Sequence, residues 1–206
     1  ALWDEGKIEV IKAAGRLSNL RAACGDQCLA SHCGIGHTRW ATHGVPNDVN
    51  AHPHRQGRVT LVHNGIIENY RALRERLERE GYHFLTQTDT EIAAALLDHH
   101  MKLHESPVAA IHAATAEMEG AYGFCMLLEG EPDTVYGIRR GSPLIAAKDE
   151  TGSYVASDVP AIIEYTRQYY LLEEEEVVVA HYGELRFYAP DGTPIEKEAK
   201  IANWSV

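Results

Sequence analysis

Helical patterns in this sequence are grouped in the middle of the chain, between two runs of strand patterns. Apolar residues recur at helical spacing over 67–77, and further helices are predicted over about 90–103 and from Ser106-Pro107, where Ser can cap a helix and Pro fits its first turn. Strands are predicted over 7–12, 59–63, 122–128, 134–139, 144–148, 154–156, 169–172, 177–181 and 185–188. This order predicts an α+β fold with two sheets and a helical layer or layers, because alternating βαβ units would interleave the two patterns.

Small polar residues and glycines predict where several elements begin and end. Ser18 is expected to cap a short helix that contains Leu20. Asn64-Gly65 is expected to turn the chain between a strand and the helix after it, and Gly81 is expected to end that helix in a left-handed conformation. Asp158-Val159-Pro160 predicts one more short helix.

The chain has the length and composition of one globular domain. Its 206 residues are 45% hydrophobic and 24% charged, which is ordinary for a soluble protein. No run approaches the roughly 18 to 20 apolar residues that cross a bilayer, and the segment that starts at Ala1 has no signal-peptide pattern. We therefore expect a cytoplasmic protein with no membrane partner.

Acidic side chains outnumber basic ones. Thirty Asp and Glu residues against 19 Lys and Arg residues give a formal net charge of -11, and no block of basic residues offsets it. A nucleic-acid backbone would be repelled over most of such a surface, which argues against a nucleic-acid partner. The four cysteines, Cys24, Cys28, Cys33 and Cys125, are too sparse to indicate a disulfide framework, and reduced thiols are expected.

The densest polar segment runs from His37 to Gly44 and follows a predicted strand. The guanidinium of Arg39 offers a planar pair of donors for a carboxylate, and the neighbouring Thr and His side chains can complete such a site. The alternative is a capped strand end with a surface ion pair. Composition alone leaves both interpretations open.

Two further segments carry groups that suit a small polar ligand. The side-chain NH₂ of Asn64 and the backbone N–H of Gly65 can point at one spot, as an oxyanion hole requires, although the same pair is common in plain turns. Asp89 can bind an ammonium group, although Thr88 and Asp89 with Glu91 in the first turn also form an ordinary helix start. Each signal needs support from outside its own segment.

Taken in this order, the three segments resemble the glutaminase domains of the glucosamine-6-phosphate synthase family, which are class II glutamine amidotransferases. The matching stretches are 12–20, 37–44, Asn50-Ala51-His52-Pro53-His54, 63–69, Thr88-Asp89-Thr90-Glu91, Gly120-Ala121-Tyr122-Gly123, Arg140-Gly141-Ser142-Pro143-Leu144 and Ala156-Ser157-Asp158. The resemblance covers nearly the whole chain. The stretch Trp40-Ala41-Thr42-His43-Gly44 favours this family over the related phosphoribosyl-diphosphate amidotransferases and asparagine synthetases.

This resemblance implies a fold and a reaction. The fold is an Ntn-hydrolase-like four-layer αββα sandwich, and the reaction begins when the thiol of an N-terminal Cys attacks the side-chain amide of L-glutamine. The α-amino group of that Cys acts as the base, since its pKa of about 7.7 to 8.0 is close to working pH. Ammonia then passes to sugar-phosphate isomerase domains of the same polypeptide, which convert fructose 6-phosphate to glucosamine 6-phosphate. The resemblance implies no cofactor or metal, and a homodimer for the full-length enzyme.

Five residues would bind glutamine if the family's roles are carried over by motif position. Arg39 would hold the α-carboxylate, with Thr42 and His43 beside it. Asp89 would pair with the α-ammonium group. Trp40 would lie next to the bound substrate, near the gating loop.

Asn64 and Gly65 would stabilise the oxyanion, but the family's nucleophile has no counterpart in this sequence. The chain begins at Ala1, at a point where the family's Cys-Gly-Ile-Val-Gly start has already ended. Cys33-Gly34-Ile35-Gly36 imitates that start, yet it is internal and has no free amine, so we interpret its cysteine as a small buried residue. Residues 1–206 are therefore expected to form a glutaminase domain without its N-terminal segment and strand and without the C-terminal isomerase domains. We expect this chain to be inactive alone and the intact parent to be an enzyme.

Two alternatives belong to other classes of protein. A metal-binding module could draw its ligands from Cys24, Cys28, Cys33, His32, His37, His52 and His54. The helical spacing of Cys24 and Cys28 is more typical of simple packing than of a zinc site. A non-catalytic glutamine sensor or regulatory subunit would instead keep Arg39 and Asp89 and need no nucleophile.

Overall fold

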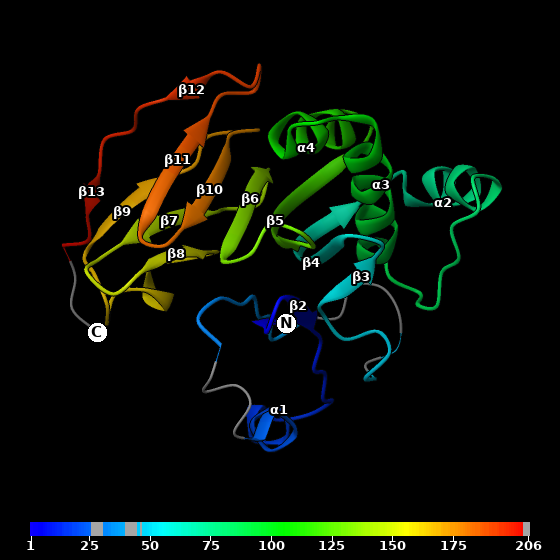
Figure 1. The fold of residues 1–206 in the computed structure, drawn as a ribbon, viewed down its shortest axis with the longest axis horizontal. Coiled ribbons are helices and arrows are strands. Elements are labelled where there is room, and N and C mark those ends of the chain that lie inside the picture. The colour runs from blue at the N-terminus through cyan, green and yellow to red at the C-terminus, as the bar shows by residue number, and fades with distance from the viewer. Residues whose placement is uncertain (26–30, 40–44, 46, 204–206) are drawn as a thin grey trace.

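Two β-sheets form the centre of the protein (Figure 1). The computed structural model describes residues 1–25, 31–39, 45 and 47–203. Its larger sheet contains β3 (His54–Gln56), β4 (Val59–Ile67), β5 (Gly120–Leu128), β6 (Thr134–Arg140), β10 (Val177–His181), β11 (Glu184–Tyr188) and β12 (Pro194–Ile195), in the order β12-β11-β10-β6-β5-β4-β3. The second sheet contains β7 (Ile145–Lys148), β8 (Ser153–Ala156), β9 (Gln168–Leu171) and β13 (Lys200–Ile201), in the order β13-β9-β7-β8. A separate hairpin contains β1 (Leu2–Asp4) and β2 (Lys7–Glu9).

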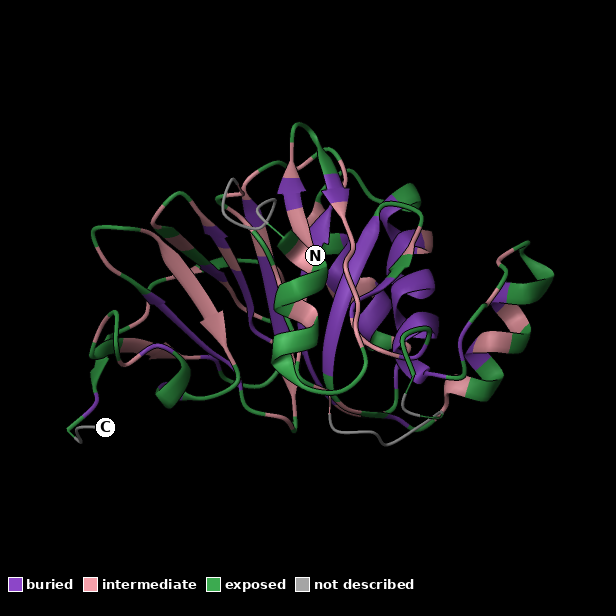
Figure 2. Cartoon of the chain, turned by 90° about the horizontal axis from the view of Figure 1, so that it is seen from below, coloured by how far each residue is buried: buried purple, intermediate pink, exposed green. Residues whose placement is uncertain are grey.

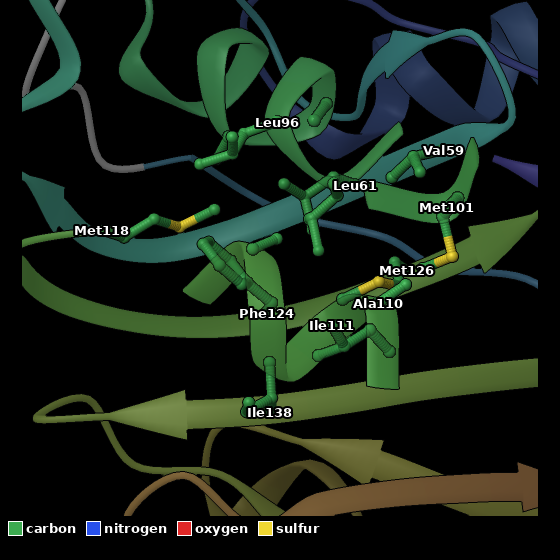
Figure 3. Packing of buried hydrophobic residues seen from close by; sticks show 14 of the residues in the cluster. Val59, Leu61, Leu96, Met101, Ala110, Ile111, Met118, Phe124, Met126 and Ile138 are labelled. Carbon is green, nitrogen blue, oxygen red and sulfur yellow. The ribbon is translucent and has the colours of Figure 1, made fainter. Parts of the chain in front are cut away.

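Helices cover one face of the larger sheet. α3 (Asp89–Leu103) and α4 (Pro107–Ala116) lie on the sheet, and α2 (Tyr70–Arg79) packs against α3 (Figure 1). The three helices predicted in the middle of the chain are confirmed. In Figure 3, Leu61 and Phe124 from the sheet lie opposite Leu96 from α3 and Ile111 from α4, and all four are fully buried. This layer forms the main hydrophobic core, and Figure 2 shows it as the largest block of buried residues.

The two sheets pack face to face through a smaller core. Its buried members are Leu144, Ala146, Leu172, Val178 and Phe187. On the other face of the second sheet, Ile145 and Ala147 pack against Val159 and Ile162, which belong to the short 3₁₀ helix η2 (Val159–Ala161) and the residue after it. The predicted α+β fold with two stacked sheets is confirmed. In the described part of the chain, a 3₁₀ turn stands where a four-layer sandwich would place its second helical layer.

β4 continues through Asn64 and Gly65 instead of turning there. Asn64 is paired with Gly123 and Gly65 with Tyr122, both on β5. Gly65 has φ +125°, and a Cβ atom on it would lie only 2.1 Å from the carbonyl oxygen of Ala121. The predicted turn is therefore wrong, because the glycine serves the close approach of β5. The longer strand carries Asn64 toward its end, where a helix follows.

Helix capping follows the sequence signals at α3 and α4 but not at α1 (Leu17–Cys24). Thr88 and Ser106 each accept a hydrogen bond from the backbone N–H three residues later, as N-caps do. In α1, Asn19 N–H donates to the carbonyl of Arg16 at 2.9 Å, so the helix starts earlier than predicted and Ser18 lies inside its first turn. All eight residues of α1 are exposed or half-buried, and this helix lies beside the sheets and not between them (Figures 1 and 2).

An extended segment before His37 pairs with the start of the chain. Trp3 N–H donates to Cys33 O at 2.9 Å, and Ile35 N–H donates to Ala1 O at 2.9 Å. This pairing stands in for the strand that the sequence predicted ahead of His37. It directs the chain toward the end of β4. Among the described residues, no helix has the length and apolar character needed to cross a membrane.

Candidate functional site

A cavity of ≈ 280 Å³ lies where segment 37–39, the end of β4 and the start of α3 meet. It is lined by His37, Arg39, His52, His63, Asn64, Gly65, Ile66, Thr88, Asp89 and Thr90. Four of the residues predicted for a site, Arg39, Asn64, Gly65 and Asp89, are thus brought to one cavity. The other three, Trp40, Thr42 and His43, lie outside the described residues.

Asp89 is placed by both secondary structure and a backbone contact. It is the first residue of α3 and is only 3% exposed. Its Oδ2 accepts the N–H of Ile67 at 2.8 Å and lies 3.9 Å from Nδ1 of His63. The helix N-terminus favours a carboxylate at this position. Thr88 caps the helix, and Asp89 lines the cavity from the first turn. The segment can therefore be both an ordinary helix start and the source of a ligand-binding carboxylate.

Arg39 lines the cavity and has an uncommon backbone conformation. Its φ is +45°, which few residues other than glycine adopt. Its backbone N–H donates to Nδ1 of His37 at 2.8 Å, and its guanidinium donates to the carbonyl of Val45 at 3.4 Å. Arg39 and Asp89 both line the cavity, so its lining residues include one cationic and one anionic type.

Asn64 presents an exposed side chain at the end of β4. Its Oδ1 lies 2.7 Å from Nε2 of His37. The neighbouring Gly65 also lines the cavity. A carboxamide NH₂ and a backbone N–H are the kinds of donor that stabilise a developing oxyanion.

Several histidines around the cavity were not predicted for the site. The rings of His37 and His52 are stacked, with centroids 4.2 Å apart, and His52 meets His54 edge to face at 5.0 Å. Burial, with the charges of neighbouring histidines, lowers the pKa of His52 to about 2. Burial and the charge of Lys12 lower the pKa of His54 to about 3. Both rings are therefore neutral at pH 7. In the sequence, each lies in a stretch that carries the resemblance, and His37, His52 and His54 were also candidate ligands of the metal-binding alternative.

The metal-binding alternative finds no geometric support. Within the described ranges, no three His, Cys, Asp or Glu side chains are arranged to hold a metal ion, and Cys28 lies outside those ranges. Burial raises the pKa of Cys33 to about 11 and that of Cys125 to about 12. Both thiols stay protonated at pH 7, which suits packing better than nucleophilic attack.

Comparison with known proteins relates the chain to one group. A family described as "Glutamine amidotransferase domain" matches residues 37–164. The glutamine–fructose-6-phosphate aminotransferase (isomerizing) of Clostridium acetobutylicum is 43% identical over 206 residues, covering 99% of this chain and 34% of the relative. The enzyme of the same name from Clostridium perfringens is 41% identical over 208 residues, covering 100% of this chain and 34% of the relative. The chain spans about a third of the length of the curated relatives it matches.

A solved structure shares the fold. The glutamine phosphoribosylpyrophosphate amidotransferase from B. subtilis superposes with a TM-score of 0.61 and 24% sequence identity, covering 75% of this chain and 34% of that one. At this sequence identity, the similarity supports a conclusion about the fold alone. It agrees with the α+β fold expected from the sequence.

Proposed function

The chain belongs to the glutamine amidotransferase domain family, and from this premise we propose that the cavity at the end of β4 binds L-glutamine and aligns its side-chain amide for the release of ammonia. The observation that carries the proposal is the meeting of Arg39, Asp89 and the Asn64-Gly65 pair at one cavity. A free amino acid carries one negative and one positive group, and this cavity offers one partner for each. Arg39 binds the α-carboxylate and Asp89 binds the α-ammonium group.

The third component of the site acts on the amide end of the substrate. The Asn64 NH₂ and the Gly65 N–H stabilise the negative oxygen that forms when the amide carbon is attacked. Trp40, Thr42 and His43 complete the substrate contacts, as the family resemblance implies. Neither Cys33 nor Cys125 is the attacking thiol, since both have raised pKa values. The 206-residue chain carries the groups that this proposal assigns to glutamine binding.

The matched relatives extend the proposal to a parent enzyme. They are named as aminotransferases of fructose 6-phosphate, and this chain corresponds to about a third of their length. We propose that residues 1–206 form the glutaminase domain of such an enzyme. Its N-terminal Cys supplies the nucleophile, and its isomerase domains use the ammonia to make glucosamine 6-phosphate. The parent enzyme works in the cytoplasm as a homodimer.

Two measurements test this function. Isothermal calorimetry on the 206-residue chain should show binding of L-glutamine, and weaker binding of L-asparagine, which carries the same charges on a side chain one methylene shorter. The full-length gene product should hydrolyse glutamine and, with fructose 6-phosphate, form glucosamine 6-phosphate. Absence of glutamine binding in both proteins would overturn the proposal. Binding by an inactive full-length product would indicate a regulatory glutamine-binding protein.

A further inference from the structure

His37 connects two parts of the candidate site through the two nitrogens of one ring. Its Nδ1 accepts the backbone N–H of Arg39 at 2.8 Å, and its Nε2 lies 2.7 Å from Oδ1 of Asn64. We propose that His37 is a positioning residue that holds the Asn64 carboxamide with its NH₂ group directed toward the oxygen of the reacting amide. This inference rests on the proposed glutaminase function and adds a residue to its machinery.

The hydrogen-bond partners determine which ring nitrogen carries the proton. A backbone N–H can only donate, so Nδ1 of His37 must offer a lone pair to Arg39. The hydrogen of the neutral ring then lies on Nε2, which must donate to an acceptor. Burial lowers the pKa of His37 and favours this neutral form.

The same argument fixes the orientation of the Asn64 side chain. If the carboxamide were rotated by half a turn, its NH₂ would face the Nε2–H of His37, and two donors would oppose each other. The oxygen of Asn64 is therefore held by His37, and the NH₂ is turned away from the ring. The terminal torsion of Asn is broad and has no strong preference of its own, so an outside contact is needed to select one orientation.

The His37 ring is itself held in place. It stacks on His52 with centroids 4.2 Å apart and an interplanar angle of 18°. Nδ1 of His52 accepts the backbone N–H of His63 at 3.3 Å, and His63 directly precedes Asn64 on β4. The two rings thus link segment 37–39 to the end of β4 by side-chain contacts as well as by the bond to Asn64.

Loss of this contact should affect the transition state more than the bound substrate. A freely rotating Asn64 would spend part of its time with its carbonyl oxygen toward the oxyanion, which is repulsive. Removal of one oxyanion donor typically costs about 100- to 1,000-fold in kcat, so a mis-oriented donor should cost about 10- to 100-fold. KM should change by less than about threefold, because the substrate's charged groups keep their partners.

The test compares two substitutions at His37 in the full-length gene product. His37→Phe keeps a flat ring for stacking on His52 but removes both nitrogens. His37→Gln places an amide NH₂ near the position of Nε2 and should recover most of the lost kcat. In an Asn64→Ala background, His37→Phe should have little further effect on kcat, because its target is gone. Unfolding temperature and glutamine affinity, measured for each variant, separate positioning from folding.

Clear outcomes would overturn the inference. The first is an unchanged kcat in His37→Phe, and the second is an equal kcat in the Phe and Gln variants. The third is that His37→Phe lowers kcat as much in the Asn64→Ala background as in the wild type. A wild-type protein that does not hydrolyse glutamine would instead contradict the proposed function. Long-range ¹H–¹⁵N spectra of the histidine-labelled 206-residue chain report which ring nitrogen of His37 is protonated. This measurement needs neither enzymatic activity nor a Phe variant that folds. They should show His37 protonated at Nε2, and protonation at Nδ1 would refute the assignment.

Discussion

The backbone N–H of Ile67 donates to Oδ2 of Asp89 at 2.8 Å, so the last residue of β4 is tied to the first residue of α3. The carboxylate that we assign to substrate binding is therefore also part of the frame that shapes the cavity. One substitution can remove the charge of Asp89 and keep its hydrogen-bond acceptor, and another can remove both.

Asp89→Asn keeps an oxygen that can accept the Ile67 N–H but removes the charge. We expect it to lower the free energy of unfolding by about 1 kcal/mol or less, the size of a helix-terminus charge effect, and to weaken glutamine binding at least tenfold. Asp89→Ala should weaken binding similarly but cost about 1 to 3 kcal/mol more in stability, because the buried N–H loses its partner. Urea denaturation and calorimetry measure the two effects. Equal stability of the two variants would show that the Ile67 bond contributes little.

Arg39→Ala should weaken glutamine binding by about 1.5 to 3 kcal/mol, the scale of a hydrogen bond to a charged group left unmade. Arg39→Lys should recover only part of the loss, since an ammonium group cannot form the same paired contact with a carboxylate. Arg186→Ala is a matched control, because Arg186 is an exposed residue of β11 that pairs with exposed Glu184. Calorimetry compares the three variants. An affinity of Arg39→Ala equal to that of the control would contradict the role.

Gly65→Ala should destabilise the fold by more than about 3 kcal/mol. The substitution combines an unfavourable positive φ, which costs about 1 to 2 kcal/mol, with a Cβ atom 2.1 Å from Ala121 O. Gly192→Ala is the control, because Gly192 also has positive φ, +81°, but nothing lies within 4 Å of its added Cβ. Gly192→Ala should lower the free energy of unfolding only by the cost of placing alanine at a positive φ. Similar unfolding midpoints for the two variants would show that the close approach of β5 is not what requires glycine at position 65.

His54→Gln should make stability less dependent on pH. Burial and the charge of Lys12 lower the pKa of His54 to about 3, whereas an unfolded His titrates near 6.5. As pH falls below 6.5, the unfolded chain takes up a proton that the folded one does not, so wild-type stability decreases by up to about 1.4 kcal/mol per pH unit from this residue. His54→Gln should be less stable than wild type at pH 7, and the gap should narrow between pH 6 and 5. A constant gap in urea denaturation across this range would contradict the prediction.

Much of the fold was predictable because strand and helix periodicities are local. The strand predicted over 177–181 is β10, and the helix predicted over 90–103 differs from α3 by one residue at its start. The prediction of a turn at Asn64-Gly65 was wrong for a non-local reason. The carbonyl of Ala121 approaches Gly65, and no neighbour in sequence reveals that contact.

From the sequence, Arg39, Asn64, Gly65 and Asp89 could be named as candidate site residues, but each also had an ordinary structural interpretation, and their roles in carboxylate, oxyanion and ammonium recognition came from the family resemblance. The tertiary structure shows that these four residues line one cavity and that Nε2 of His37 lies 2.7 Å from Oδ1 of Asn64. The physical reason is that hydrogen bonds and ring stacking between distant segments depend on how β4, α3 and residues 37–39 pack together. Local patterns of apolar and polar residues predict the elements, but they do not encode the distances between them.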